Sequence, residues 1–283
     1  MIDAHHHVWD PSAARHDWLA SYPAIRRPFS VADFAEVSEP QGVTSSVLVQ
    51  VLASPGETVE FLLLAATSAG RIAGVVGWAD LTSASVADEL ARLRELPGGH
   101  LLVGIRHLVQ DEPDPDWLRR PDVGRGLRAV GDAGLIYDLL VRPAQMPAAI
   151  AVTTELSDVG FVLDHGGKPE IASSRTEPWA SLAADLARRP NVSCKVSGLV
   201  TEAGRDWTGE QIAPYAEWLL QCFGSGRLMF GSDWPVCTLA AGYGEVIALA
   251  RGLLSPHLAP AELNDVFAGN AVRHYGLAPT APS

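Results

Sequence analysis

The sequence contains little cysteine and no long apolar run. Its 283 residues include three cysteines, Cys194, Cys222 and Cys237, an odd number at wide spacing. This pattern argues against a disulfide framework and is typical of a reducing cytoplasm. No stretch of about twenty apolar residues could span a membrane, and the N-terminus lacks the basic region and apolar run of a secretory signal. We therefore expect a cytoplasmic protein with no membrane partner.

Lysine is also scarce, and acidic residues outnumber basic ones. Only two of the 21 basic residues are lysines, Lys168 and Lys195, and the formal net charge is −12. So negative a chain is a poor partner for nucleic acid or for an anionic membrane surface. A local group of cations could still bind an anionic small molecule, so an acidic substrate stays open.

Short aliphatic or β-branched runs alternate with amphipathic segments along the whole chain. Eight runs are predicted to be strands: Ile2–Val8, Ser46–Val51, Ile72–Trp78, Leu101–His107, Leu135–Val141, Gly160–His165, Asn191–Ser197 and Leu228–Ser232. Nine segments are predicted to be helices: Val31–Val37, Glu57–Ala69, Val86–Leu96, Val123–Ala133, Pro147–Leu156, Pro178–Arg189, Gly209–Phe223, Tyr243–Leu254 and Pro260–His274. Several strands are apolar almost throughout, which is typical of a sheet covered by protein on both faces.

This alternation predicts an α/β fold, a (β/α)8 barrel of the TIM type, with the ninth helix at the C-terminus. The alternative is a doubly wound open sheet, but no glycine-rich phosphate loop follows the first strand. Residues 208–211 (TGEQ) have the spacing of a capping box, so a helix should begin there. We expect a single barrel domain over residues 1–277 and a frayed tail over residues 278–283.

Three consecutive histidines lie at the end of the first predicted strand. Because side chains alternate along a strand, His5 and His7 share one face and His6 points the other way. Residues i and i+2 are about 6–7 Å apart along a strand, so the two imidazoles can converge on one ion. Imidazole is also the commonest metal ligand among side chains. The alternative is a chance histidine run whose members are hydrogen-bonded in the core.

Two more strand ends carry groups suited to the same chemistry. His165 closes the sixth strand and precedes two glycines, which allow the backbone to turn tightly beside a ligand. Asp233 follows the eighth strand, and Pro235 prevents simple continuation of that strand. In a barrel these ends meet at the face where function concentrates. The alternatives are a structural histidine and an aspartate that caps its own loop.

Four basic residues near strand ends are candidate substrate ligands. Arg106 and His107 are neighbours on the fourth strand, so only one of them can face the barrel axis. An arginine there could hold a carboxylate or polarise a carbonyl. Lys195 falls within the seventh strand, where an unpaired ammonium would be unfavourable, and Lys168 follows His165 closely. For Arg106 the alternative role is a surface salt bridge.

Several motifs occur at these strand ends in a fixed order. They are His5-x-His7, LDHGGKP around His165 and GSDWPV around Asp233, together with GIRH, CKVSGL and the closing VFAGNAVRHYGL. With them the chain resembles the amidohydrolase superfamily, and within it the branch of sugar-lactone and aromatic-pathway lactonases. The resemblance covers nearly the whole chain. It implies a (β/α)8 barrel that hydrolyses a cyclic ester, with L-fuconolactone, L-rhamnonolactone and related aldonolactones as typical substrates.

The resemblance also implies roles for the site residues. Asp233 and His165 would be catalytic, and one divalent ion, zinc before others, would be held by His5, His7, His165 and Asp233. Superfamily members with two metals carry a bridging lysine or glutamate after strand four and histidines after strands five and six. Here strand five offers Asp138 instead, so a binuclear centre is not expected. Operation without a metal stays an alternative, because some lactonases of this branch work that way.

Other functions stay open at this point. The substrate could be a dicarboxylate lactone from aromatic degradation, or the enzyme could be a metal-dependent decarboxylase of the same superfamily. A sugar-acid binder without chemistry is a third alternative, but binding hydroxyl groups does not require both a histidine cluster and a carboxylate. We expect a small-molecule lactone as substrate and no nucleic-acid partner, and a homo-oligomer stays open.

Overall fold

The barrel predicted from the sequence is present in the computed structural model, which describes residues 1–278. The eight strands are β1 (Ile2–His6), β2 (Ser45–Val49), β3 (Ile72–Gly77), β4 (Leu102–His107), β5 (Ile136–Leu139), β6 (Phe161–Leu163), β7 (Val192–Val196) and β8 (Leu228–Phe230). Each agrees with its prediction to within two residues at either end. The tail expected at residues 278–283 lies, from Pro279 on, outside the described residues.

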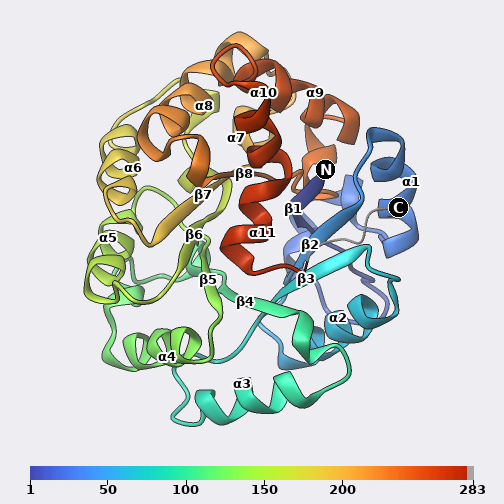
Figure 1. Ribbon diagram of the computed structural model, residues 1–283, viewed down its shortest axis with the longest axis vertical. Coiled ribbons are helices and arrows are strands. Elements are labelled where there is room, and N and C mark those ends of the chain that lie inside the picture. The colour runs from blue at the N-terminus through green and yellow to red at the C-terminus, as the bar shows by residue number, and fades with distance from the viewer. Residues whose placement is uncertain (279–283) are drawn as a thin grey trace.

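The strands form one parallel sheet in sequence order from β1 to β8. The sheet closes on itself between β1 and the chain that follows β8 (Figure 1). There the backbone N–H of His7 donates to the carbonyl of Trp234 at 2.7 Å, and the N–H of Asp233 donates to the carbonyl of His5 at 2.8 Å. Closure therefore brings the first strand against the segment that follows the last, and the chain is a single-domain (β/α)8 barrel.

Helices surround the strands (Figure 1). They are α1 (Val31–Ser38), α2 (Pro55–Thr67), α3 (Val86–Glu95), α4 (Pro121–Asp132), α5 (Met146–Glu155), α6 (Trp179–Ala187), α7 (Leu199–Ala203), α8 (Gly209–Phe223), α9 (Tyr243–Leu254), α10 (Pro260–Asn264) and α11 (Asn270–Tyr275). None of the described helices is both long and apolar enough to cross a membrane.

Two features of the helices differ from the predictions. The segment expected as one helix from Pro260 to His274 is divided into α10 and α11 by a π-helical turn over Asp265–Gly269. The capping box at the start of α8 is half formed: the Thr208 hydroxyl accepts from the N–H of Gln211 at 3.2 Å. The Gln211 side chain turns instead to the carbonyl of Ile171, so it satisfies a neighbouring loop rather than the helix end.

Helix α11 lies across the end of the barrel where the strands begin (Figure 1). Its residues Ala271 and Tyr275, together with Leu277, pack against apolar side chains of the barrel interior such as Ile2 and Val47. The apolar side chains on the outer faces of the strands pack against the surrounding helices in a second, larger cluster. Because α11 covers one end, only the opposite end of the barrel can admit a ligand.

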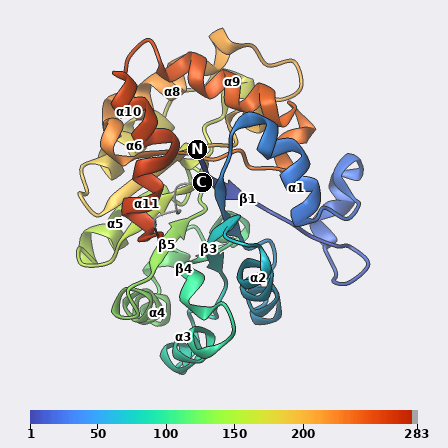
Figure 2. The ribbon, with the colours of Figure 1, turned by 45° about the vertical axis from the view of Figure 1, so that its right-hand side comes forward.

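Between β1 and α1 the chain makes an excursion over residues 10–28. Trp9 and Phe29 exchange two backbone hydrogen bonds of 3.0 and 2.8 Å, so the excursion leaves and returns at one point. It contains two short 3₁₀ helices, Asp17–Ser21 and Pro23–Ile25, and it lies beside α1 (Figure 2). This segment supplies a wall of the cavity described below.

A buried carboxylate anchors the loop after β2. Oε2 of Glu57, in the first turn of α2, accepts hydrogen bonds from the backbone N–H groups of Val51 and Leu52 at 2.8 and 2.9 Å. Burial raises the pKa of Glu57 to about 7, although these two bonds pull it down. Over the pH range between its unfolded and folded pKa values, the folded protein therefore holds a proton that the unfolded chain has lost. Stability should consequently fall as the pH rises from about 5 to about 7.

Replacing Glu57 with glutamine is expected to remove this part of the pH dependence. The wild type should lose on the order of 2 kcal/mol of unfolding free energy relative to the variant between pH 5 and pH 8. Urea unfolding at the two pH values measures this difference. Glu36→Gln, which removes an exposed charge from helix α1, is the control and should follow the wild type. Parallel pH profiles for Glu57→Gln and the wild type would contradict the assignment.

Candidate active site

A cavity of about 890 Å³ opens at the C-terminal ends of the strands. The excursion over residues 10–28 contributes Trp18 and Tyr22 to its wall, and the loops after β6 and β8 contribute His165 and Asp233. His7 also lines it. The residues that the sequence placed at strand ends thus share one cavity at the face where barrel enzymes carry their active sites.

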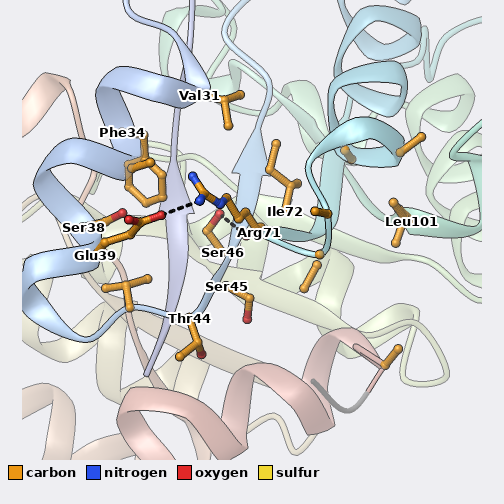
Figure 3. Close-up of a pocket in the computed structure, with 18 of the residues that line it drawn as sticks. Val31, Phe34, Ser38, Glu39, Thr44, Ser45, Ser46, Arg71, Ile72 and Leu101 are labelled. Atoms are coloured by element: carbon orange, nitrogen blue, oxygen red, sulfur yellow. Dashed lines mark hydrogen bonds and ion pairs between the residues drawn. The ribbon is translucent and has the colours of Figure 1, made fainter. Parts of the chain in front are cut away.

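A second hollow, of about 910 Å³, lies on the side of the barrel between α1 and α2 (Figure 3). Its two full charges, Arg71 and Glu39, pair with each other at 2.8 Å. Within residues 1–278, none of the predicted site residues lines this hollow. It therefore offers no converging groups for catalysis.

Strand β1 carries the first two groups of the site. The Nε2 atoms of His5 and His7 are 3.2 Å apart. Nδ1 of His7 lies 2.8 Å from the carbonyl of Val49; since a carbonyl can only accept, this Nδ1 carries the hydrogen and Nε2 presents its lone pair. The ring of His6 points away and stacks on Phe34, with 3.8 Å between ring centroids. The alternation predicted for the three histidines is therefore confirmed.

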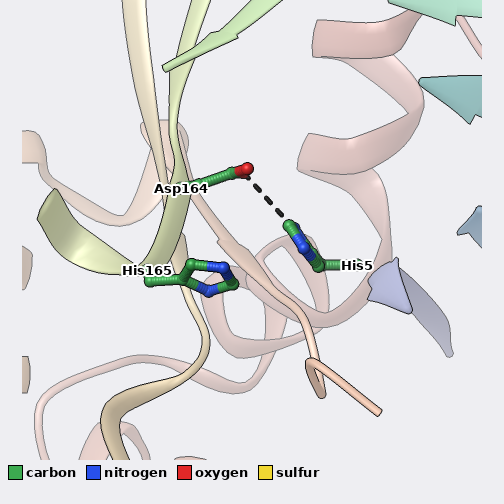
Figure 4. Close-up of side chains that lie close together, drawn as sticks. All are labelled: His5, Asp164 and His165. Carbon is green, nitrogen blue, oxygen red and sulfur yellow. Dashed lines mark ion pairs between the residues drawn. The ribbon is translucent and has the colours of Figure 1, made fainter. Parts of the chain in front are cut away.

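The end of β6 brings two consecutive residues to the same place. His165 has a left-handed backbone, with φ of +53°, so the alternation of the strand ends and both Asp164 and His165 turn toward His5 (Figure 4). Asp164 Oδ1 is 3.3 Å from His5 Nδ1, and the rings of His165 and His5 are 4.5 Å apart. Gly198 lies against His165: its φ is +66°, and a Cβ there would come within 2.8 Å of the His165 Nδ1. A side chain at position 198 would displace the imidazole.

Three imidazoles gather around Oδ1 of Asp233. This oxygen lies 3.3 Å from Nε2 of His7, 3.8 Å from Nε2 of His5 and 3.9 Å from Nε2 of His165. Burial alone would raise the pKa of Asp233, but attraction to the protonated form of His165 and its neighbours outweighs burial and holds that pKa well below its usual value. Burial lowers the pKa of His165 to about 4. At neutral pH the site therefore contains the ionised carboxylate of Asp233 beside the neutral imidazole of His165.

The atoms that converge here suit a divalent cation. Because the Nδ1–H of His7 is committed to Val49, its Nε2 and the Asp233 oxygen are two acceptors that face each other at 3.3 Å. A tetrahedral zinc ion with bonds of about 2.0–2.2 Å holds its ligand atoms about 3.4 Å apart, close to the separations among His5, His7 and Asp233. The overlapping group of His5, Asp164 and His165 fits less well, because Asp164 already pairs with two cations.

Arg106 projects from β4 into the site. Its Nη1 donates to Asp164 Oδ2 at 2.9 Å, and its Nε donates to the side-chain oxygen of Gln50 at 3.0 Å. Nη1 also lies 3.2 Å from Nε2 of His5. The guanidinium is thus neutralised by Asp164, fixed in orientation by Gln50, and present in the cavity wall.

Lys195 lies beneath the cavity, inside the barrel. Its Nζ is 2.6 Å from Asp138 Oδ2, 2.9 Å from Asp164 Oδ1 and 3.2 Å from His5 Nδ1. The hydroxyl of Tyr275, from α11, donates to the Asp138 carboxylate at 2.8 Å. Burial raises the pKa of Asp138 to about 6, against the pull of Lys195. A continuous series of polar contacts therefore joins the helix that closes the barrel to the histidines at the cavity floor.

Of the four basic residues predicted to bind substrate, Arg106 and Lys168 line the cavity, whereas Lys195 and His107 do not. Lys195 has no exposed surface and its charge is taken up by Asp138 and Asp164. His107 points outward, as the strand neighbour of Arg106 must. Its ring stacks on Trp117 at 4.4 Å between centroids. The expectation that Lys195 and His107 contact substrate therefore has no geometric support.

Two residues of the site are not singled out by the sequence analysis. Asp164 directly precedes His165, and strict alternation would have pointed it away from the cavity. Gln50 is the one amide in the apolar run SSVLVQV. It is fully buried, and a lone polar side chain in such a run is a signal that could have identified it, because a buried amide needs a partner.

Known proteins resemble this chain over nearly its whole length. The profile of the family described as Amidohydrolase, Amidohydro_2, matches residues 2–277. The L-fucono-1,5-lactonases of Burkholderia ambifaria and Burkholderia multivorans are 36% and 37% identical to it, over 98% of this chain and 95% and 96% of their own sequences. The crystal structure of an amidohydrolase from Burkholderia multivorans with bound zinc has a TM-score of 0.92 and 36% identity, and the match covers 98% of this chain and 99% of that one.

Proposed function

The chain belongs to the amidohydrolase family, and on that premise we propose that it hydrolyses the ester bond of a sugar lactone and releases the free sugar acid. One observation carries the proposal: the carboxylate of Asp233 lies among three imidazoles, those of His5, His7 and His165, in the wall of a cavity of about 890 Å³. These groups can accept and return a proton, as the activation of water beside a small cyclic ester requires. The two relatives named L-fucono-1,5-lactonase support the choice of ester.

In the proposed reaction, Asp233 first accepts a proton from a water molecule. The water oxygen bonds to the lactone carbonyl carbon, and the carbonyl electron pair moves onto its oxygen. The C–O bond of the ring then breaks as the carbonyl re-forms, and Asp233 returns its proton to the departing ring oxygen. One water is consumed and a hydroxy acid is formed, so the carboxylate ends in the state in which it began.

His165 and Arg106 are suited to stabilise the negative oxygen formed on the way. Nδ1 of His165 lies 2.9 Å from the hydroxyl of Ser197; when that hydroxyl donates, the imidazole presents Nε2–H to the cavity. Arg106 lies in the same wall, with its guanidinium held in place by Gln50 and Asp164. Donors held in place before the reaction stabilise developing charge without the cost of reorganising solvent.

A single zinc ion is the metal proposed for this site. Nε2 of His5, Nε2 of His7 and Oδ1 of Asp233 would hold it. When bound, zinc supplies the Lewis acidity that lowers the pKa of a water to about 7. A carboxylate with a pKa as low as that of Asp233 is by itself a weak base. A water made more acidic by zinc would therefore be easier for Asp233 to deprotonate. The zinc-bound relative supports the proposal.

A pH-indicator assay with a panel of aldono-1,5- and aldono-1,4-lactones tests this function. We expect acid release well above the spontaneous rate for at least one neutral sugar lactone. Chelation should lower that rate, and added zinc should restore it. If protein supplied with zinc or manganese opens no lactone of the panel, the proposed function is wrong. An undiminished rate in protein shown by elemental analysis to be metal-free would contradict only the zinc proposal.

A further inference from the structure

A partly buried ion pair crosses the cavity wall close to His165. Lys168 follows the two glycines after His165, and its Nζ lies 3.2 Å from Oε1 of Glu202 in α7. Both side chains line the cavity, and they are only 16% and 17% exposed. Neither residue takes part in the chemistry proposed above, so the pair requires another explanation.

The charges of the inner cavity are matched one to one, with one exception. Arg106 pairs with Asp164, and Lys168 pairs with Glu202. The remaining carboxylate, Asp233, is among the residues proposed to hold zinc. Two further guanidinium groups of the lining, Arg142 and Arg205, belong to exposed residues at the rim, where water screens them. The inner part of the described cavity therefore holds no cationic side chain that is free to receive a carboxylate.

We propose that Glu202 determines substrate charge: by holding Lys168, it makes the site select uncharged lactones and reject lactones that carry a carboxylate. The inference rests on the proposed lactonase function and extends it to a substrate class. A substrate carboxylate could reach Lys168 only by displacing Glu202, which would leave that glutamate unpaired in a poorly hydrated wall. An uncharged ring with hydroxyl groups does not meet this obstacle.

The variant that tests the proposal is Glu202→Gln, which keeps the size of the side chain and frees the charge of Lys168. Activity is measured with a neutral probe, L-fucono-1,5-lactone, and with a carboxylated probe, D-glucaro-1,4-lactone. We expect the ratio of kcat/KM for the carboxylated probe to that for the neutral probe to rise at least about tenfold in Glu202→Gln. The gain should shrink at high salt and disappear in the double variant Lys168→Met with Glu202→Gln.

Glu89→Gln is the control, because Glu89 is an ion-paired carboxylate that contacts Arg92 on the outer helix α3, away from the cavity. It removes the same charge and should leave the ratio unchanged. If Glu202→Gln lowers activity toward both probes equally, or if the wild type already prefers the carboxylated probe, Glu202 does not select charge.

Binding separates this inference from the proposed function. The affinities of the two probes are measured by calorimetry for Asp233→Asn and for the double variant Asp233→Asn with Glu202→Gln. Neither variant is expected to turn the probes over, so these affinities report charge selection alone. The relative affinity for the carboxylated probe should rise when Glu202 is replaced, and an unchanged relative affinity would overturn the inference. A wild type that opens no lactone while the affinities shift as expected would contradict the hydrolytic function and leave charge selection supported.

Discussion

Asp233→Asn is expected to lower kcat for lactone hydrolysis by about 10³- to 10⁴-fold. The variant loses the group that accepts the proton from water and returns it to the ring oxygen, and it weakens the set of acceptors proposed to hold zinc. Asparagine is the appropriate replacement because Asp233 has a left-handed backbone with φ of +59°, a conformation that asparagine tolerates better than most residues. A fall in kcat at nearly constant thermal stability is therefore the expected pattern.

Steady-state kinetics and a thermal melt of the same preparation check this result. The kinetics are measured with a lactone that the wild type hydrolyses. An Asp233→Asn variant that keeps a tenth of the wild-type kcat would show that Asp233 does not carry the proton. Binding of zinc, followed by elemental analysis, distinguishes the two losses: full zinc occupancy with no turnover would assign the defect to proton transfer alone.

Lys195→Met is expected to lower the free energy of unfolding by about 3–5 kcal/mol. The lysine is fully buried, and its removal leaves Asp138 and Asp164 inside the barrel without their shared cation. The pKa of Asp138 is already raised to about 6 by burial, and loss of Lys195 should raise it further. Since a raised folded-state pKa favours the folded state at low pH, the difference from the wild type should shrink as the pH falls from 8 toward 5.

Denaturant unfolding at several pH values measures this effect, and the other lysine of the chain supplies the control. Lys168 is also ion-paired, but it is partly buried at the cavity wall, whereas Lys195 has no exposed surface. Lys168→Met should therefore cost less, about 1–2 kcal/mol. Equal losses for the two variants would mean that the fully buried network contributes no more than the partly buried pair at the cavity wall.

Most of the barrel is predictable because each strand is covered on both faces and so appears as a short apolar run. Elements too short to show a hydrophobic period cannot be predicted in this way. Helix α7 has five residues, and the excursion over residues 10–28 is held by tertiary contacts such as the bond from Trp9 Nε1 to the carbonyl of Arg27 at 3.0 Å. Such contacts join residues whose proximity no local pattern reveals.

The position of the site follows from the topology of the barrel, but the depth of each side chain within it does not. His5, His7, His165 and Asp233 could be placed together because all lie at strand ends. The sequence placed Lys168 and Lys195 equally close to strand ends. Lys168, which follows its strand, reaches the cavity, whereas Lys195, which lies within its strand, does not. Asp164 was not predicted as a site residue because the prediction assumed that side chains alternate up to the end of the strand. The left-handed backbone of His165 ends this alternation.

The closure of the barrel between β1 and the chain after β8 also makes the site depend on the most distant contacts of the fold. Asp233 lies more than 220 residues beyond His7 in the sequence. Contacts between residues so far apart are slow to form, because the entropy of closing the intervening loop must be lost before they stabilise anything. A partly folded chain in which β1 is paired with β2 but not with the segment after β8 therefore holds His5 and His7 without the carboxylate beside which they work. The chemistry of the site becomes available only once the barrel has closed.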